Sequence, residues 1–256
     1  MTASSLEGKV VIVTGASRGI GAASALAFAE AGARLVLAAR SAEPLLAVAA
    51  TIKQRGGEAL AVTADVTDAA SVEQLVGRAL DAFGRLDAAF NNAGTGHSPK
   101  RLAEFSPEEF EAGLQANLRG VFLGMRYEIP AMLLSGGGAI VNMSSSAGLQ
   151  GAPGMGPYVA AKHAVVGLTR TAAIDYAKSN IRVNALAPGP IVNERMAARL
   201  TPEMRDFIGA QVPMGRMGAM DEVARAAVWL CSEEASFVTG AVLSVDGGRL
   251  AGTAVV

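Results

Sequence analysis

The chain contains very little cysteine, histidine or aromatic residue. Its 256 residues include one cysteine, Cys231, and two histidines. A single cysteine excludes an intrachain disulfide framework, and so few soft ligands argue against a zinc site of the His/Cys type. Cysteine this rare is typical of a reducing compartment, so we expect a cytoplasmic protein with no metal site.

Charge of one sign and long apolar runs are lacking as well. The 22 Lys+Arg and 23 Asp+Glu leave a formal net charge of -1, so no basic field exists to attract nucleic acid or anionic lipid. No apolar run approaches the roughly 18 residues that a membrane span needs, and residues 1–9 lack the apolar core of a signal peptide. We therefore expect neither a nucleic-acid partner nor a membrane.

What is present is a chain that is 51% hydrophobic and has 30 glycines, above the usual share of ~7%. Short apolar runs predict strands at Val10–Thr14, Arg34–Ala38, Ala59–Thr63, Ala88–Phe90, Ala139–Met143, Val183–Leu186 and Ala241–Val245. Between them, helices are predicted at Ile20–Ala31, Ala42–Arg55, Ala69–Phe83, Glu108–Leu134, Tyr158–Lys178 and Met220–Cys231. This alternation predicts an α/β fold: one domain over residues 1–256 with a doubly wound parallel sheet of about seven strands.

One segment departs from this alternation, between Pro188 and Met220. No strand is predicted there, and five of the ten methionines cluster in it: Met196, Met204, Met214, Met217 and Met220. Methionine fills irregular apolar gaps, and ligands of open α/β sheets bind beyond strand ends. We therefore expect a substrate lid at about residues 189–219; the alternative is a surface helix whose methionines cap the core.

A glycine-rich turn follows the first predicted strand, in Thr14-Gly15-Ala16-Ser17-Arg18-Gly19-Ile20-Gly21. Gly15 permits a sharp turn, Gly19 lets the backbone approach a pyrophosphate, and Gly21 allows close helix–strand packing. The helix that follows offers free N–H groups and a positive dipole end to an anion. The turn therefore predicts a dinucleotide site, although a turn that packs for its own sake is the alternative.

The end of the second predicted strand bears on which dinucleotide binds. Sites for a free ribose 2′-hydroxyl usually place an acid there, whereas an arginine accommodates a 2′-phosphate. Here Ala39 and Arg40 occupy that place, and Arg18 lies in the turn. This favours NADP(H) over NAD(H), with two solvated arginines as the alternative.

A tyrosine and a lysine stand four residues apart in Tyr158-Val159-Ala160-Ala161-Lys162. The chain holds three tyrosines and five lysines, so about 0.06 such pairs are expected by chance. On a helix this spacing places both side chains on one face. A neighbouring cation lowers the pKa of a phenol and makes it a usable acid/base. Ser144, Ser145 and Ser146 follow a predicted strand and can hold a substrate oxygen, but the residues alone do not separate them.

Together these motifs resemble the short-chain dehydrogenase/reductase family, whose fold is of the Rossmann type. The resemblance covers nearly the whole chain: Thr14-Gly15-x3-Gly19-Ile20-Gly21, Asn91-Asn92-Ala93-Gly94, Ser145, Tyr158-x3-Lys162, Pro188-Gly189 and the stretch from Phe237-Val238-Thr239-Gly240 to Val245-Asp246-Gly247-Gly248. It implies hydride transfer between a nicotinamide and a ketone, aldehyde or secondary alcohol, without metal. It also implies a homo-oligomer, a tetramer or dimer.

The resemblance also implies roles for individual residues. Ser145, thirteen residues before Tyr158, would polarise the carbonyl, and Tyr158 would be the general acid/base. Lys162 would lower the pKa of Tyr158 and bind the nicotinamide ribose, and Asn117 would support a water and proton path to that lysine. The residues expected to bind the cofactor are Gly15, Ser17, Arg18, Gly19, Ile20, Gly21, Arg40, Asp65, Val66, Asn92, Ala93, Gly94, Tyr158, Lys162, Pro188, Gly189, Ile191 and Asn193. Asn193 departs from the threonine that the family often has there.

Two loops border the expected substrate mouth. The loop Gly148–Pro157 has no cationic side chain, so we expect a small uncharged carbonyl or alcohol substrate. His97, on the other loop, is expected to be solvated, with a second acid/base role as the alternative. Three other functions stay open: an NAD-dependent alcohol dehydrogenase, a 3-oxoacyl carrier-protein reductase, and a catalytically idle dinucleotide-binding module.

Overall fold

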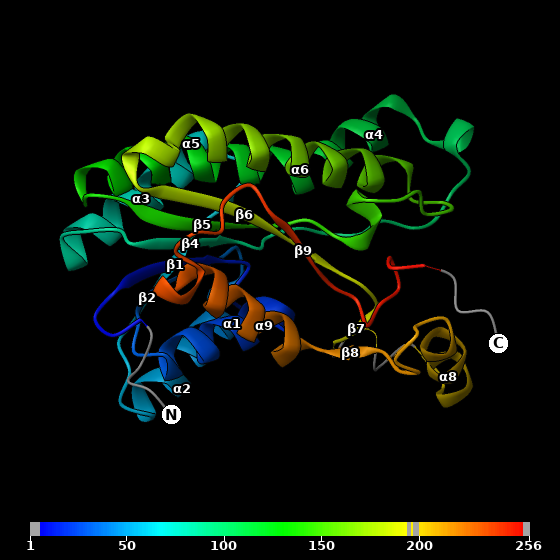
Figure 1. The fold of residues 1–256 in the computed structure, drawn as a ribbon, viewed down its shortest axis with the longest axis horizontal. Helices are drawn as coiled ribbons and strands as arrows, with labels where there is room; N and C mark the ends of the chain where they lie inside the picture. Colours follow the sequence, from blue (N-terminus) through cyan, green and yellow to red (C-terminus); the bar gives the residue numbers. More distant parts are fainter. Residues whose placement is uncertain (1–5, 194–195, 197–199, 253–256) are drawn as a thin grey trace.

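A seven-stranded parallel sheet forms the centre of the molecule (Figure 1). The computed structural model describes residues 6–193, 196 and 200–252. The strand order is β3-β2-β1-β4-β5-β6-β9, which confirms the predicted doubly wound sheet. The strands are β1 Val10–Thr14, β2 Arg34–Ala39, β3 Ala59–Thr63, β4 Ala88–Asn91, β5 Gly138–Met143, β6 Ile181–Pro188 and β9 Val242–Val245.

Two layers of helices cover the sheet, one on each face (Figure 1). One layer contains α1 Gly19–Glu30, α2 Ala42–Gln54 and α9 Met220–Cys231. The other contains α3 Ala69–Phe83, α5 Gly120–Leu134 and α6 Gly156–Tyr176, with the short α4 Pro107–Leu114 beside α6. Within the described residues no helix is both long and apolar enough to cross a membrane.

Successive residues of each strand pack against opposite layers. In β1, Val11 and Val13 face α1, α2 and α9, whereas Val10 and Ile12 face α3, α5 and α6. All four are fully buried, and burying a valine or isoleucine side chain contributes roughly 1.5–3 kcal/mol. The continuous apolar strands of the sequence are therefore explained by a sheet that is covered on both faces.

The predicted helix Glu108–Leu134 is wrong in one respect, because a π-helical segment at Gln115–Arg119 divides it. The side-chain amide of Asn117 donates to the Gly113 carbonyl at 3.1 Å, and its other bonds go to a loop. A side chain that enters the backbone hydrogen-bond ladder opens it locally and produces such a bulge. The helical periodicity of the sequence does not reveal the one extra residue that a π-helical segment contains.

The prediction that no strand lies between Pro188 and Met220 is also wrong. β7 Ile191–Val192 pairs in parallel with β8 Gly218–Ala219, and α8 Pro202–Ala210 lies between them in the chain. Each of these strands has two residues, too few for any alternation to be visible in the sequence. The pair ties the two ends of the expected lid together beyond the main sheet (Figure 1).

Candidate active site

The predicted site residues gather at the carboxyl edge of the sheet, where parallel strands end side by side. Strand order reverses between β1 and β4, and this edge receives the loops that follow β1, β3, β4, β5 and β6. These loops, with the strand and helix ends beside them, carry five of the predicted elements: Gly15–Gly21, Asp65–Val66, Asn92–Gly94, Ser145 and Pro188–Gly189. The fold therefore brings distant motifs together at a topological switch point.

Two glycines of the glycine-rich turn, Gly15 and Gly21, are packed so closely that a side chain does not fit there. A Cβ at Gly21 would lie 2.1 Å from the Gly15 carbonyl oxygen, and one at Gly15 would lie 2.9 Å from Nδ2 of Asn92. Gly15 and Gly19 have φ of 67° and 59°, in the left-handed region that favours glycine. The Asn92 amide donates to the Thr14 carbonyl at 2.9 Å, so the loop after β4 supports the turn after β1.

The amino end of α1 suits a phosphate group. Its first turn holds no acidic residue, and the preceding Arg18 makes no side-chain cap. The N–H groups and the positive dipole end of the helix are therefore available to an anion. Arg18 is exposed beside them, whereas Ser17 and Ile20 are half-buried. These residues fit the pyrophosphate of a dinucleotide.

The region after β2 and β3 offers both a cation and an anion. Asp65 accepts hydrogen bonds from the backbone and hydroxyl of Thr67, and these, with a smaller effect from the Arg40 charge, lower its pKa. Arg40 is exposed at the end of β2, near enough to act on Asp65. The neighbouring Val66 packs against Gly120, where a Cβ would lie 2.8 Å from its side chain.

Tyr158 and Lys162 lie on the inner side of α6, as their spacing predicts. The Lys162 ammonium lies 5.6 Å from the centroid of the Tyr158 ring and donates to the Met143 carbonyl at 2.7 Å. Lys162 is almost completely buried, and burial lowers its pKa to about 8. Tyr158 is partly exposed.

The pKa of Tyr158 is raised in the free protein, whereas the expectation from the sequence is that Lys162 lowers it. Burial is the largest cause of the rise, and a side-chain hydrogen bond with Ser145 opposes it. The ammonium of Lys162 faces the ring and is bound to the Met143 carbonyl. Residue spacing places two groups on one face, but it does not reveal which atoms they approach.

The structure distinguishes the three serines after β5. Ser144 is buried, and its hydroxyl donates to the Lys162 carbonyl at 2.9 Å. Ser146 begins a short 3-10 turn. Ser145 is the one whose hydroxyl is hydrogen-bonded to Tyr158, and it also accepts from the Ala147 backbone at 3.2 Å. Only Ser145 is placed to share a substrate oxygen with Tyr158.

Asn117 holds the loop after β4. Its amide donates to the Thr95 carbonyl at 2.8 Å, and its oxygen accepts from the Thr95 backbone at 3.1 Å. A Cβ at Gly94 would lie 2.7 Å from this oxygen and 3.6 Å from the Lys162 ammonium. Asn117, Gly94 and Lys162 therefore meet at one point, as a path from Asn117 to the lysine requires.

The two loops expected at the substrate mouth pack against each other. The Lys100 backbone donates to the Gly154 carbonyl at 3.2 Å, and a Cβ at Gly156 would lie 2.8 Å from Leu102. His97, expected to be solvated, is half-exposed: its ring stands edge-on to Phe105, with 5.0 Å between centroids. Its Nδ1 bonds the Ser98 carbonyl, and Nε2 is buried without a hydrogen-bond partner among the described residues.

The methionines of the expected lid divide between surface and core. Met204 and Met214 are exposed, whereas Met217 is buried and Met220 packs against the core. Asn193 does not stand free: its side-chain oxygen accepts from the Met196 backbone at 2.9 Å. Residues 194–195 and 197–199, also within the predicted lid, lie outside the described residues.

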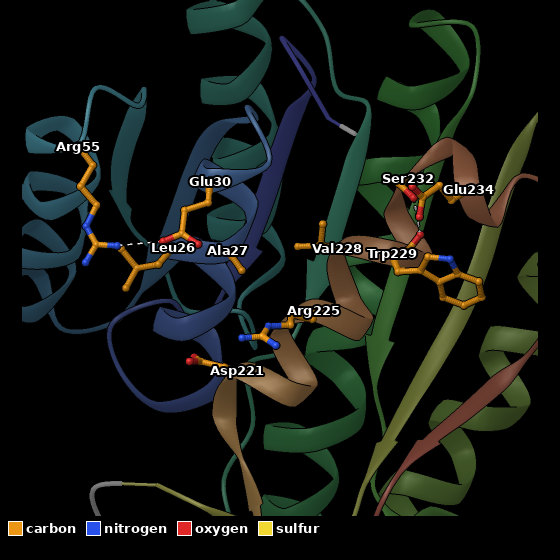
Figure 2. A pocket seen from close by; sticks show the side chains of 10 residues that line it. All are labelled: Leu26, Ala27, Glu30, Arg55, Asp221, Arg225, Val228, Trp229, Ser232 and Glu234. Atoms are coloured by element: carbon orange, nitrogen blue, oxygen red, sulfur yellow. Dashed lines mark hydrogen bonds and ion pairs between the residues drawn. The ribbon is translucent and has the colours of Figure 1, made fainter. Parts of the chain in front are cut away.

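A hollow lies between α1 and α9 (Figure 2), away from the predicted site residues. Its volume is about 490 Å³, and Figure 2 shows Arg225 extending from α9 toward α1 while the indole of Trp229 points away. None of the predicted site residues lines it. Among the described residues, no group of three His, Cys, Asp or Glu side chains is placed to hold a metal ion.

The sequence and the fold are both similar to those of known proteins. Residues 15–249 match the family model described as Enoyl-(Acyl carrier protein) reductase. The chain is 44% identical to an A-factor type gamma-butyrolactone 1'-reductase (1S-forming) of Streptomyces virginiae, over 95% of this chain and 96% of that protein. It is 44% identical to a 2,5-dichloro-2,5-cyclohexadiene-1,4-diol dehydrogenase of Sphingobium indicum, over 96% and 98%. The crystal structure of levodione reductase superposes with a TM-score of 0.91 at 37% identity, over 96% and 99%.

Proposed function

Since the chain belongs to the short-chain dehydrogenase/reductase family of NAD(P)-dependent oxidoreductases, we propose that it uses Tyr158 as general acid/base with NADP(H). The substrate is a ketone or aldehyde, or the corresponding secondary alcohol. One observation carries the assignment. The Ser145 hydroxyl is hydrogen-bonded to Tyr158, and the Lys162 ammonium lies over the same ring.

Each side chain has a distinct task in reduction. A bound nicotinamide supplies the hydride to the carbonyl carbon. The Ser145 hydroxyl donates a hydrogen bond to the carbonyl oxygen, and Tyr158 donates the proton to it. The raised pKa of Tyr158 keeps the phenol protonated at neutral pH, ready for donation. The Lys162 ammonium stabilises the phenolate that remains after proton transfer. Asn117 holds the loop after β4 and supports the path by which a proton reaches Lys162.

The cofactor is held by backbone and side chains at the carboxyl edge. Gly15, Ser17, Gly19, Ile20 and Gly21 form the phosphate turn, and the remaining contacts are proposed for Asp65, Val66, Asn92, Ala93, Gly94, Pro188, Gly189, Ile191 and Asn193. The absence of a side-chain cap and of acidic residues at the start of α1 supports an anion there. The Asn193 side-chain oxygen accepts one hydrogen bond from the Met196 backbone, and the side-chain NH2 of this residue is proposed to bind the cofactor.

The preference for NADP(H) rests on two exposed arginines, Arg18 and Arg40. No acid ends β2, and in such folds an arginine near this position accommodates a ribose 2′-phosphate. An NAD-dependent alcohol dehydrogenase is the alternative, since Asp65 lies near Arg40 and its charge opposes a phosphate.

We propose a small, uncharged, cyclic carbonyl or alcohol as substrate, with residues 189–219 as its lid. The loop Gly148–Pro157 has no cation, and relatives are named for reduction of a butyrolactone and oxidation of cyclohexadiene-diol and cyclohexanol. A second candidate is 3-oxoacyl carrier-protein reduction, because a Thermotoga maritima relative of that name is 37% identical. An idle dinucleotide-binding module is disfavoured by the presence of Asn117, Ser145, Tyr158 and Lys162.

We also propose a cytoplasmic homo-oligomer, a dimer or tetramer. A groove of about 440 Å³ lies between α6 and the stretch from Leu114 through the π-helical segment to Phe122, and is lined mainly by apolar residues. Phe122 in this groove is 49% exposed, and Ile174, further along α6, is 79% exposed. Large apolar side chains that stand open on a helical face are typical of an interface with another chain.

The test is Tyr158→Phe, assayed with NADPH and NADH against a panel of cyclic ketones and alcohols and an acylated carrier protein. We expect turnover to fall at least about 100-fold, while NADPH affinity changes little. Tyr176→Phe is the matched control, since it removes a phenol from the same helix away from Ser145. Turnover by Tyr158→Phe at the wild-type rate would refute the assignment, and a wild-type preference for NADH would refute the arginine clamp.

A further inference from the structure

Polar side chains that the proposed chemistry does not use are buried between two strands and two helices. Asn91 ends β4 and Asn142 lies opposite it on β5. Glu128 comes from α5 and Thr169 from α6, and all four are at most 2% exposed. Buried polar groups are costly unless hydrogen-bonded, so the bonds that join them determine how they sit.

These four residues form a chain of hydrogen bonds in which Asn91 donates toward both ends. The Asn91 amide donates to Oε2 of Glu128 at 2.9 Å and to Oδ1 of Asn142 at 3.1 Å. The Asn142 amide donates to Oγ1 of Thr169 at 3.0 Å and to Sδ of Met125 at 3.3 Å. Each amide has two hydrogens, and both are used. The acceptor at the Glu128 end therefore decides which way both amides face.

The chain of bonds ends beside the residues proposed for catalysis. Thr169, Lys162 and Tyr158 are spaced by seven and four residues on α6, so they share its inner face. Four successive positions at the end of β5 contact this face: Asn142 bonds Thr169, the Met143 carbonyl bonds Lys162, Ser144 bonds the Lys162 carbonyl, and Ser145 bonds Tyr158. The position of α6 along β5 therefore determines how Tyr158 lies relative to Ser145.

We propose that Glu128 is a positioning residue for the reaction: its acceptor oxygen orients Asn91 and Asn142, and through Thr169 they hold α6 in line with β5. The inference rests on the proposed function of Tyr158 and Ser145. Glu128 acts as an acceptor and not as a charge, because a carboxyl group has an acceptor oxygen in either protonation state.

The geometry around Glu128 separates this role from simple packing. An apolar residue in its place would fill the α5 core without the cost of burying a carboxyl group. It would also leave the Asn91 amide with one hydrogen unpaired, so that only the bond to Asn142 still orients the amide. Gly124, one turn earlier on α5, leaves the room that Asn91 needs, since a Cβ there would lie 2.5 Å from its oxygen.

The experiment compares Glu128→Leu, which removes the acceptor, with Glu128→Gln, which keeps one. We expect Glu128→Leu to lower kcat about tenfold through misalignment, with KM for NADPH within about twofold of wild type. Glu128→Gln restores kcat to within about twofold. Met132→Ala, one turn further along α5 and outside the chain of bonds, is the matched control: it lowers Tm but leaves kcat within about twofold.

A second measurement needs no turnover. The methyl group of Met125 reports the direction of the Asn142 amide, and its resonance in ¹³C-methyl-methionine spectra is assigned by Met125→Leu. It is expected to shift in Glu128→Leu and to stay in place in Glu128→Gln. An unmoved resonance in Glu128→Leu, wild-type kcat in that variant, or equal loss of kcat in both variants would overturn the proposal. If the wild type reduces no carbonyl while the resonance shifts as expected, the proposed function fails and the orienting role of Glu128 stands.

Discussion

The two helical layers of this protein cover the same sheet but differ in what they bury. The layer of α1, α2 and α9 packs an apolar core around Phe28 and Phe90, whose ring centroids lie 6.4 Å apart. The layer of α3, α5 and α6 buries Lys162, Glu128 and Thr169 among its apolar residues. The sheet therefore has an almost wholly apolar interior on one face. On the other face, the apolar interior also contains hydrogen-bonded polar side chains.

The difference follows from what each layer supplies to the site. The α1 layer offers a phosphate group backbone N–H donors at a helix end, and these need no buried side chain. The α6 layer supplies side chains for proton transfer, so titratable groups must enter its interior. Each then needs a partner, as Lys162 has in the Met143 carbonyl and Glu128 has in Asn91.

The largest expected effect tests the apolar layer. Phe28→Ala removes a fully buried ring and should lower the free energy of unfolding by about 3–5 kcal/mol. Because Phe28 lies in the α1 layer and Tyr158 and Lys162 lie on α6, across the sheet, kcat should stay near wild type well below Tm. Urea denaturation and steady-state kinetics check both; a matching loss of kcat would show that the layers are not separable.

The next effect tests the polar layer through pH. Burial raises the pKa of Glu128 from 4.5 to about 7, opposed by the Asn91 hydrogen bond. A raised folded-state pKa gives stability that is present in full below pH 4.5 and lost as pH rises to about 7, on the order of 3 kcal/mol. Unfolding of wild type and Glu128→Gln across this window should show the loss in wild type alone. Parallel curves would contradict the shift.

A smaller effect is expected on cofactor binding at the glycine-rich turn between β1 and α1. A Cβ at Gly21 would lie 2.1 Å from the Gly15 carbonyl, so Gly21→Ala must displace the turn. We expect NADPH affinity to fall about 10- to 100-fold, which corresponds to roughly 1.4–2.8 kcal/mol. Gly77→Ala on α3 is the control, since nothing lies within 4 Å of a Cβ there. Fluorescence titration measures both.

The smallest effect lies at the rim of the polar layer. Asp68 caps α3 by accepting from the Ser71 backbone at 3.2 Å. Asp68→Ala should cost about 1 kcal/mol of stability and leave kcat unchanged. Asp68→Asn retains an oxygen acceptor and should recover most of the loss in thermal unfolding; equal losses would show that the cap contributes little.

Much of the site could be predicted because it depends on local order in the chain. Gly15, Gly19 and Gly21 stand directly after a strand, and Tyr158 and Lys162 share one helical face, so spacing alone placed them. The partners of Lys162 and Asn117 could not be predicted in this way. They are a carbonyl on β5 and the backbone of a loop, and backbone acceptors leave no signature in residue type.

The sequence by itself determined the seven strands of the main sheet, most helices and the order of motifs, because apolar runs and glycine turns act over a few residues. Only the tertiary structure decided that Ser145, and not Ser144, faces Tyr158. The same structure decided that burial raises the pKa of this phenol, where the sequence predicts a pKa lowered by Lys162. It also decided that Glu128, which no motif marks, is buried against Asn91. Burial and hydrogen-bond direction arise where segments distant in sequence meet, and that meeting is a property of the packed sheet.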